Sequence, residues 1–111
     1  MACLLLAGAR ASVRCAAMDI GDFQRTMART YRDRDAQRGV DATFRWLTEE
    51  MGELARAVRK GSDDDVALEF SDVLAWTASL ANLLDVDLER SLSRYANGCP
   101  KCGGLPCNCP L

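Results

Sequence analysis

The chain has 111 residues, of which 49% are hydrophobic and 27% are charged, the balance of one soluble globular domain with a modest core. Its net charge of -2 provides no basic field that would attract nucleic acid. It contains no histidine, which excludes both nucleophile pairs that need His and di-iron bundles built on Glu-x-x-His.

Residues 1–17 differ in composition from the rest of the chain. They carry two arginines, no acidic residue and a short apolar run at residues 4–7. That run is too short for a secretory signal or a membrane span, so neither is expected. Two interpretations stay open: a disordered extension before a functional start at Met18, and an organelle transit peptide. Without a secretory signal, a reducing cytoplasm is the expected compartment.

Apolar residues at helical spacing predict an all-α domain of four helices over residues 18–98. The first helix is expected over residues 19–37, with Asp19 or Asp22 as its N-cap and Gly39 at its end. Five arginines on this helix or directly after it form either a solvated face or a source of phosphate contacts: Arg25, Arg29, Arg32, Arg34 and Arg38.

The second and third helices are the longest of the four. The second is expected over residues 41–60, with Asp41 as its N-cap. The third is expected over residues 64–84, and a capping box of Ser62 and Asp65 should start it.

The apolar faces of the helices predict how the domain assembles. On a short fourth helix, residues 88–96, the inward side chains are expected to be Leu88, Leu92 and Tyr95. The expected core side chains of the second and third helices include Phe44, Leu47, Met51, Leu54, Val58, Val66, Phe70, Val73, Leu74, Leu80 and Leu84. One chain of this length cannot cover all these faces. An antiparallel four-helix bundle-like domain, completed in a homodimer or homotetramer, is therefore expected.

Five carboxylates gather on the second and third helices: Glu49, Glu50, Glu53, Glu69 and Asp72. Between residues 67 and 84 the last two are the only charges, which predicts a buried helix. Unpaired carboxylates in such surroundings are costly, so they call for a shared cation or for arginine partners across the bundle. With no histidine, a cation is held by oxygen alone, which favours Mg²⁺ with Mn²⁺ as a substitute.

The motifs Glu49-Glu50-x-x-Glu53 and Glu69-x-x-Asp72 resemble those of the MazG-like nucleoside triphosphate pyrophosphohydrolases, an all-α superfamily. The resemblance covers about residues 19–97. It implies Mg²⁺-dependent hydrolysis of the α–β phosphoanhydride of a (d)NTP to the monophosphate and pyrophosphate. It also implies that Glu50, Glu53, Glu69 and Asp72 are metal ligands, and that Glu49 supports a metal or orients the attacking water.

The nucleotide needs further partners. The candidates for phosphate contacts are Lys60, Arg90 and Arg94, and the candidate for a polar contact near the site is Asn97. The last two match positions where members of the family carry Lys and Asn. Trp46 and Trp76 each lie one turn from a ligand candidate, so each either stacks on a base or packs in the core.

The tail, residues 99–111, is rich in Cys, Pro and Gly and has little helix or strand potential. Its Cys-Pro-x-Cys-Gly motif resembles the turn of a zinc knuckle, and four thiolates could close one tetrahedral Zn²⁺ site. Free thiols, a redox pair and disulfides stay open, because the second pair is Cys-x-Cys. The four cysteines are Cys99, Cys102, Cys107 and Cys109. Cys3 and Cys15 are interpreted as incidental.

Two other functions compete with the enzyme. One is a helical interaction module or zinc adaptor without catalytic activity. The other is an inactive bundle of the same fold that only binds nucleotide.

Overall fold

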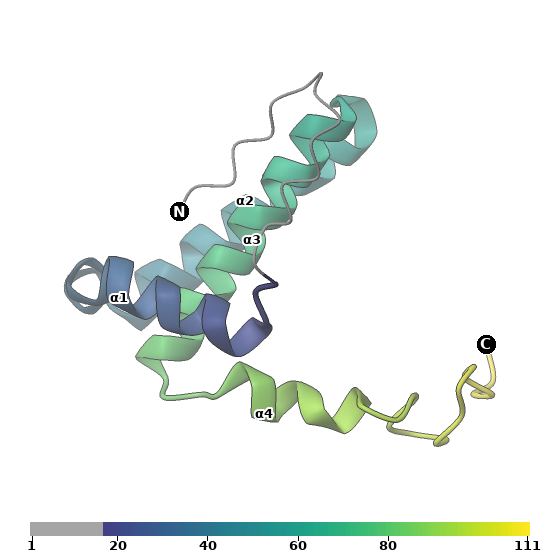
Figure 1. Ribbon diagram of the computed structural model, residues 1–111. Helices are drawn as coiled ribbons and strands as arrows, with labels where there is room; N and C mark the ends of the chain where they lie inside the picture. The colour runs from purple at the N-terminus through teal and green to yellow at the C-terminus, as the bar shows by residue number, and fades with distance from the viewer. Residues whose placement is uncertain (1–16) are drawn as a thin grey trace.

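The computed structural model describes residues 17–111, so the prediction of a disordered extension falls almost wholly outside the described residues. The described chain forms α1 (Ile20–Arg38), α2 (Val40–Lys60), α3 (Asp63–Leu83), the short α4 (Leu88–Leu92) and the 3₁₀ turn η1 (Ser93–Tyr95) (Figure 1). Residues 17–111 contain no strand, and the predicted all-α class with four helices is confirmed. Among these helices, none combines the length and the apolar composition that crossing a bilayer requires.

A sharp elbow at Gly39 joins α1 and α2. The φ of Gly39 is 83°, in the left-handed region that glycine adopts without steric cost. Its N–H donates to the carbonyl of Asp35 at 2.8 Å and so ends α1. The predicted N-cap at Asp41 is wrong, because α2 already begins at Val40 with Gly39 as its cap. Asp41 instead lies in the first turn, where its charge suits the helix dipole.

The other predicted caps are confirmed. The Asp19 carboxylate accepts from the N–H of Asp22 at the start of α1, at 2.7 Å. At the start of α3, the Ser62 hydroxyl accepts from the N–H of Asp65, and the Asp65 carboxylate accepts from the N–H of Ser62. These reciprocal bonds satisfy donors that the helix cannot pair internally. The fourth helix is shorter than predicted, since its α-helical part ends at Leu92 and a 3₁₀ turn continues it to Tyr95.

The long helices α2 and α3 lie side by side as an antiparallel pair, and α1 crosses them (Figure 1). At the elbow, the buried Asp35 accepts from the Arg38 guanidinium at 2.8 Å, and that guanidinium also contacts the hydroxyl of the fully buried Thr43 at 3.4 Å. These contacts fix the end of α1 against the start of α2.

The single chain buries little large apolar surface. Within residues 17–111, the buried apolar residues are the small side chains Ala57, Ala78 and Ala81. The predicted core side chains of α2 and α3 are not all buried within one chain, as the expectation that one chain cannot cover these faces implies: Phe44 is 58% exposed and Phe70 is 52% exposed. Further exposed side chains that were expected inside are Met51, Val58, Leu74, Leu84, Leu92 and Tyr95. The reason is geometric: the described helices cover one side of the α2–α3 pair and leave the other side open.

Candidate active site

Three of the predicted ligands converge between α2 and α3. Glu50, Glu69 and Asp72 each bring one carboxylate oxygen to within 4.8 Å of the others. The spacing of Glu69 and Asp72 puts them on one face of α3, and the antiparallel pairing brings Glu50 of α2 opposite. Oxygens bound to one Mg²⁺ lie at most about 4.2 Å apart, since each Mg–O distance is about 2.1 Å. Small side-chain rotations would therefore let this all-oxygen cluster hold a hard divalent cation.

The surroundings of the three acids differ from the expectation in one respect. They are half-buried and not lodged in a closed apolar interior, because α3 is open on one side in the single chain. The ion pairs formed within residues 17–111 involve other acids, namely Asp19, Asp22 and Asp35. The alternative that the clustered acids pair with arginines across the bundle therefore finds no support in the described chain.

The clustering of the acids changes their pKa values. The pKa of Glu50 is raised from 4.5, first by partial desolvation and then by the negative charges of Asp72 and Glu69, while the Trp76 indole acts in the opposite direction. The pKa of Glu69 is also raised, first by desolvation and then by the charges of Glu53 and Asp72. A cation bound between these groups would relieve the repulsion.

The structure separates the other two acids of α2. Glu53 lies beside the cluster: it shares a surface cavity of about 240 Å³ with Glu69 and Lys60, but its oxygen is not part of the three-residue group. Glu49 is exposed and borders a different hollow with Arg45 and Trp46. The metal role of Glu53 and the catalytic role of Glu49 stay predictions.

The two tryptophans stack on each other next to the acids. The ring centroids of Trp46 and Trp76 are 5.8 Å apart, with an angle of 13° between the planes. The guanidinium of Arg38 lies over the Trp76 ring at 4.6 Å. This favours the packing alternative for Trp76, whereas Trp46 is 45% exposed and keeps more surface for a ligand.

A cavity of about 330 Å³ between α1 and α3 opens beside Asp72. Its lining combines basic, aromatic and hydroxyl groups with the acid: Tyr31, Arg34, Asp35, Arg38, Asp72, Ala75, Trp76 and Ser79. Tyr31 was not among the predicted site residues, and its only signal was the helical spacing of the first helix. Arg34 and Arg38 entered the prediction only as two of five arginines that could reach a phosphate. A larger cavity of about 630 Å³ contains none of the clustered acids and lies mainly against α1 and the α3–α4 connection.

Two predicted substrate contacts lie outside the cavities that border the acids. Arg94 is exposed, with its guanidinium 5.3 Å from the ring centroid of Tyr95. Asn97 is exposed as well, and neither residue lines the cavities that contain Glu53, Glu69 or Asp72. The arm formed by α4 and the tail extends away from the helical body (Figure 1).

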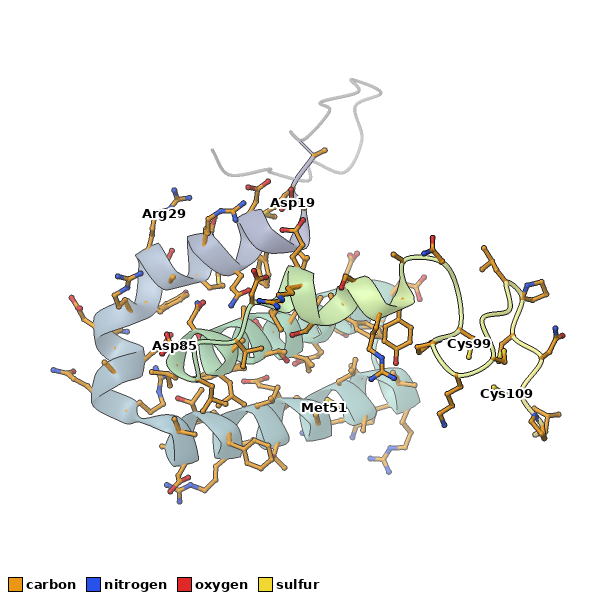
Figure 2. All side chains as sticks on the ribbon, turned by 90° about the horizontal axis from the view of Figure 1, so that it is seen from below. Asp19, Arg29, Met51, Asp85, Cys99 and Cys109 are labelled. Atoms are coloured by element: carbon orange, nitrogen blue, oxygen red, sulfur yellow. The ribbon has the colours of Figure 1, made fainter. Side chains whose placement is uncertain are left out.

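The four tail cysteines form a second cluster of metal-binding side chains. Cys99, Cys102, Cys107 and Cys109 bring their sulfur atoms to within 4.8 Å of one another. Figure 2 shows Cys99 and Cys109 on the part of the chain that projects beyond the helices. Backbone N–H groups of Asn108 and Gly104 lower the pKa of Cys102 to about 6.

Comparison with known families agrees with this arrangement. The family model of the MazG nucleotide pyrophosphohydrolase domain matches residues 38–100, which is more than half of the chain. The match includes α2, α3 and α4, and therefore both acidic motifs. No curated protein matches the sequence. The chain belongs to the MazG nucleotide pyrophosphohydrolase family.

Proposed function

We propose that this protein hydrolyses a nucleoside triphosphate to the monophosphate and pyrophosphate with Mg²⁺, for which Mn²⁺ can substitute. Membership of the family implies a nucleotide substrate and a divalent metal. The observation that carries the proposal is the convergence of Glu50, Glu69 and Asp72 with no guanidinium paired to them in residues 17–111.

The carboxylates of α2 and α3 are proposed to have two roles, metal binding and activation of water. Glu50, Glu69 and Asp72, with Glu53 beside them, would hold the metal ion through carboxylate oxygens. When bound, Mg²⁺ supplies neutralisation of phosphate charge and a fixed geometry for the phosphate oxygens. Glu49 would accept a proton from the attacking water or orient it, as the resemblance implies.

In the reaction, the oxygen of water bonds to the α-phosphorus, and the bond from that phosphorus to the bridging oxygen breaks. Pyrophosphate leaves with the bridging oxygen, and the proton lost by the water passes to a carboxylate and then to solvent. The chain contributes by holding these groups in line and by placing positive charge near the leaving phosphates.

The cavity beside Asp72 is the proposed binding site for the remainder of the nucleotide. Arg34 and Arg38 supply positive charge there, and Tyr31 supplies a ring and a hydroxyl group. Lys60 lies in the cavity on the other side of the acids and is proposed to contact a phosphate. Trp46 is the proposed stacking partner for a base, because its indole is more exposed than that of Trp76.

We further propose that the active protein is a homodimer or homotetramer. The exposed apolar side chains on α2 and α3 support this, since a small monomer rarely leaves so many large apolar side chains exposed to water. Arg94 and Asn97 line neither cavity beside the acids, and we propose that they contact a nucleotide held at the acid cluster of a second chain.

The test is pyrophosphate release from a panel of (d)NTPs with Mg²⁺, with Mn²⁺, and with EDTA. We expect the monophosphate and pyrophosphate as products with metal and no turnover with EDTA. Release of inorganic phosphate and a diphosphate would place the cleaved bond elsewhere. No turnover with any nucleotide would favour the interaction module or zinc adaptor, whereas Mg²⁺-dependent binding without product would favour the inactive bundle.

A further inference from the structure

The tail after Gly98 folds into turns and bends without an apolar core to hold them. It contains no helix or strand, and most of its residues are exposed, including Leu105 at 82%. A segment this short cannot bury enough apolar surface to offset the conformational entropy of ordering it. Small units of this kind are normally held by a metal or by disulfides.

The sulfur atoms of the tail have the spacing of a tetrahedral site. Cys99 Sγ lies 3.8 Å from Cys109 Sγ, and Cys102 Sγ lies 3.8 Å from Cys107 Sγ. Four sulfurs at the usual Zn–S distance of about 2.3 Å form a tetrahedron with edges of about 3.8 Å. The four sulfurs also lie within 4.8 Å of one another, so they surround a single point.

Backbone amides point at the sulfurs, as they do around metal-bound thiolates. Cys102 Sγ accepts from the N–H groups of Gly104 at 3.4 Å and Asn108 at 3.3 Å. Cys107 Sγ accepts from the N–H of Cys109 at 3.3 Å. These donors favour thiolates over thiols and fix the direction of each lone pair.

The first two cysteines lie in a tight turn that only particular residues can form. Cys99 donates its N–H to the carbonyl of Gly104 at 2.9 Å, and its carbonyl accepts from the N–H of Gly103 at 2.8 Å. Gly98, just before this turn, has a φ of 114°, and a Cβ there would meet the Gly104 carbonyl oxygen at 2.7 Å. The turn therefore depends on glycine, and it presents two sulfurs on one side.

We propose that Cys99, Cys102, Cys107 and Cys109 bind one Zn²⁺ ion in a closed, structural site that is separate from the acid cluster. An all-sulfur tetrahedral set selects a soft or borderline ion and excludes Mg²⁺. All four positions belong to the protein, so no place is left for a substrate or water, and the ion orders the tail.

Zinc content of the full-length reduced protein tests the site. After exchange into metal-free buffer with a reductant that does not chelate zinc, we expect about one zinc per chain, as for a four-thiolate site. Replacing the ion by Co²⁺ should give the visible absorption of tetrahedral cobalt together with intense sulfur-to-cobalt charge-transfer bands. Cys102→Ser and Cys107→Ser should each lower zinc to below about one tenth of the wild-type content, because loss of one thiolate opens the site.

Controls separate this site from the acids and from the other cysteines. A Cys3→Ser/Cys15→Ser variant and Asp72→Asn should both keep about one zinc per chain, because neither removes a proposed ligand. The Cys102→Ser variant should keep the helical circular dichroism of the wild type, since the tail contributes little to the body of the fold.

Three results would overturn the site. One is a reduced wild-type chain that takes up neither zinc nor cobalt. The second is full zinc content in both the Cys102→Ser and Cys107→Ser variants. The third is a metal-free chain whose intact mass shows two disulfides in place of four thiols. None of these results depends on nucleotide hydrolysis, so failure of the zinc site and failure of the proposed activity are distinguishable.

Discussion

The guanidinium of Arg38, at the end of α1, lies over the ring of Trp76 on α3, with Cζ 4.6 Å from the ring centroid. The same guanidinium donates to Asp35, which is 3% exposed, and Trp76 stacks in turn on Trp46 of α2. One side chain thus connects all three long helices next to the acid cluster. A cation over a ring and a buried ion pair both depend on the planar shape of the arginine head group.

Replacing Arg38 with alanine should lower the free energy of unfolding by about 3 kcal/mol, because the buried Asp35 carboxylate loses its partner. Arg38→Lys should recover only part of this, since an ammonium group cannot both stack and pair in the same way. Chemical denaturation measures both variants. The matched control is Arg29→Ala on the exposed face of α1, which should change stability by less than about 0.5 kcal/mol. Equal losses for Arg38→Ala and the control would contradict the connecting role of Arg38.

Asp72→Asn should reduce pyrophosphate release on the order of 100-fold or more, because even groups that only support a metal ligand are worth 10–100-fold. Without Mg²⁺, the variant should be as stable as the wild type or more so, since the charge that raises the pKa of Glu50 is removed. Glu53→Gln should behave in the same way if Glu53 is a ligand. Activity assays and thermal melts in EDTA measure the two effects.

The matched control for these variants is Asp64→Asn, an exposed carboxylate in the first turn of α3 away from the cluster. It should keep wild-type activity. Unfolding of both Asp72→Asn and Glu53→Gln would instead indicate that the acids form structural ion pairs.

The stability of the metal-free protein should depend on pH through Glu50 and Glu69. Both have pKa values raised above 4.5 in the folded chain. At pH values between the pKa of the unfolded chain and the higher pKa of the folded chain, the folded chain binds more protons than the unfolded chain. The stability that the two carboxyl groups contribute is therefore fully present below pH 4.5 and is lost as the pH rises through their pKa values in the folded chain. In EDTA, the melting temperature should therefore fall in this range relative to that of a Glu50→Gln/Glu69→Gln variant.

Mg²⁺ should restore the melting temperature of the wild type at neutral pH and leave that of the double variant unchanged, because only the wild type has the charges that bind it. The carboxyl groups with lowered pKa values, Asp22 and Asp65, act below 3.8. The lowered pKa of Cys102 is common to the wild type and the double variant, so it does not obscure the difference between them. Parallel melting curves for wild type and double variant above pH 4.5 would count against the cluster.

The open face of α2 and α3 should be an interface between copies of this chain. Phe70→Lys, which places a charge on this face, should convert the protein to a monomer and lower its melting temperature, because the surface buried by the partner is lost. Light scattering combined with gel filtration measures the mass. Asp33→Lys on the exposed part of α1 is the control and should keep the oligomer. A wild-type chain that is already monomeric at micromolar concentration would contradict the interface.

Local chemistry explains which parts of the fold were predictable. The capping box of Ser62 and Asp65 lies within four residues, so its spacing in the sequence was sufficient. The start of α2 was misplaced because Gly39 both ends one helix and caps the next, and a glycine cap leaves no side-chain signal. The same limit applies to the core: a helical face of apolar residues looks alike whether this chain or a second one covers it.

From the residues alone the acid cluster was predictable as a region, and it was the resemblance to the family that named Glu50, Glu69 and Asp72 as ligands. Neighbouring positions on a helix differ by about 100° in direction, so the pairing of α2 with α3 decides that Glu50 and not Glu49 faces Asp72. The contact between Arg38 and Trp76 depends on how α1 crosses α3, which no local pattern encodes. The cavity lined by Tyr31 and Arg34 follows from the same crossing.

Gly39 alone connects α1 and α2, so the length of this connection determines how α1 packs on the other helices. One added residue at Gly39 would lengthen the connection and change where α1 crosses the α2–α3 pair. Arg38 would then no longer reach Trp76 while keeping Asp35, and the cavity beside Asp72 would lose its basic wall. Engineered tags, insertions and permuted termini should therefore be introduced elsewhere, because the connection at Gly39 fixes the position of α1 relative to α2 and α3.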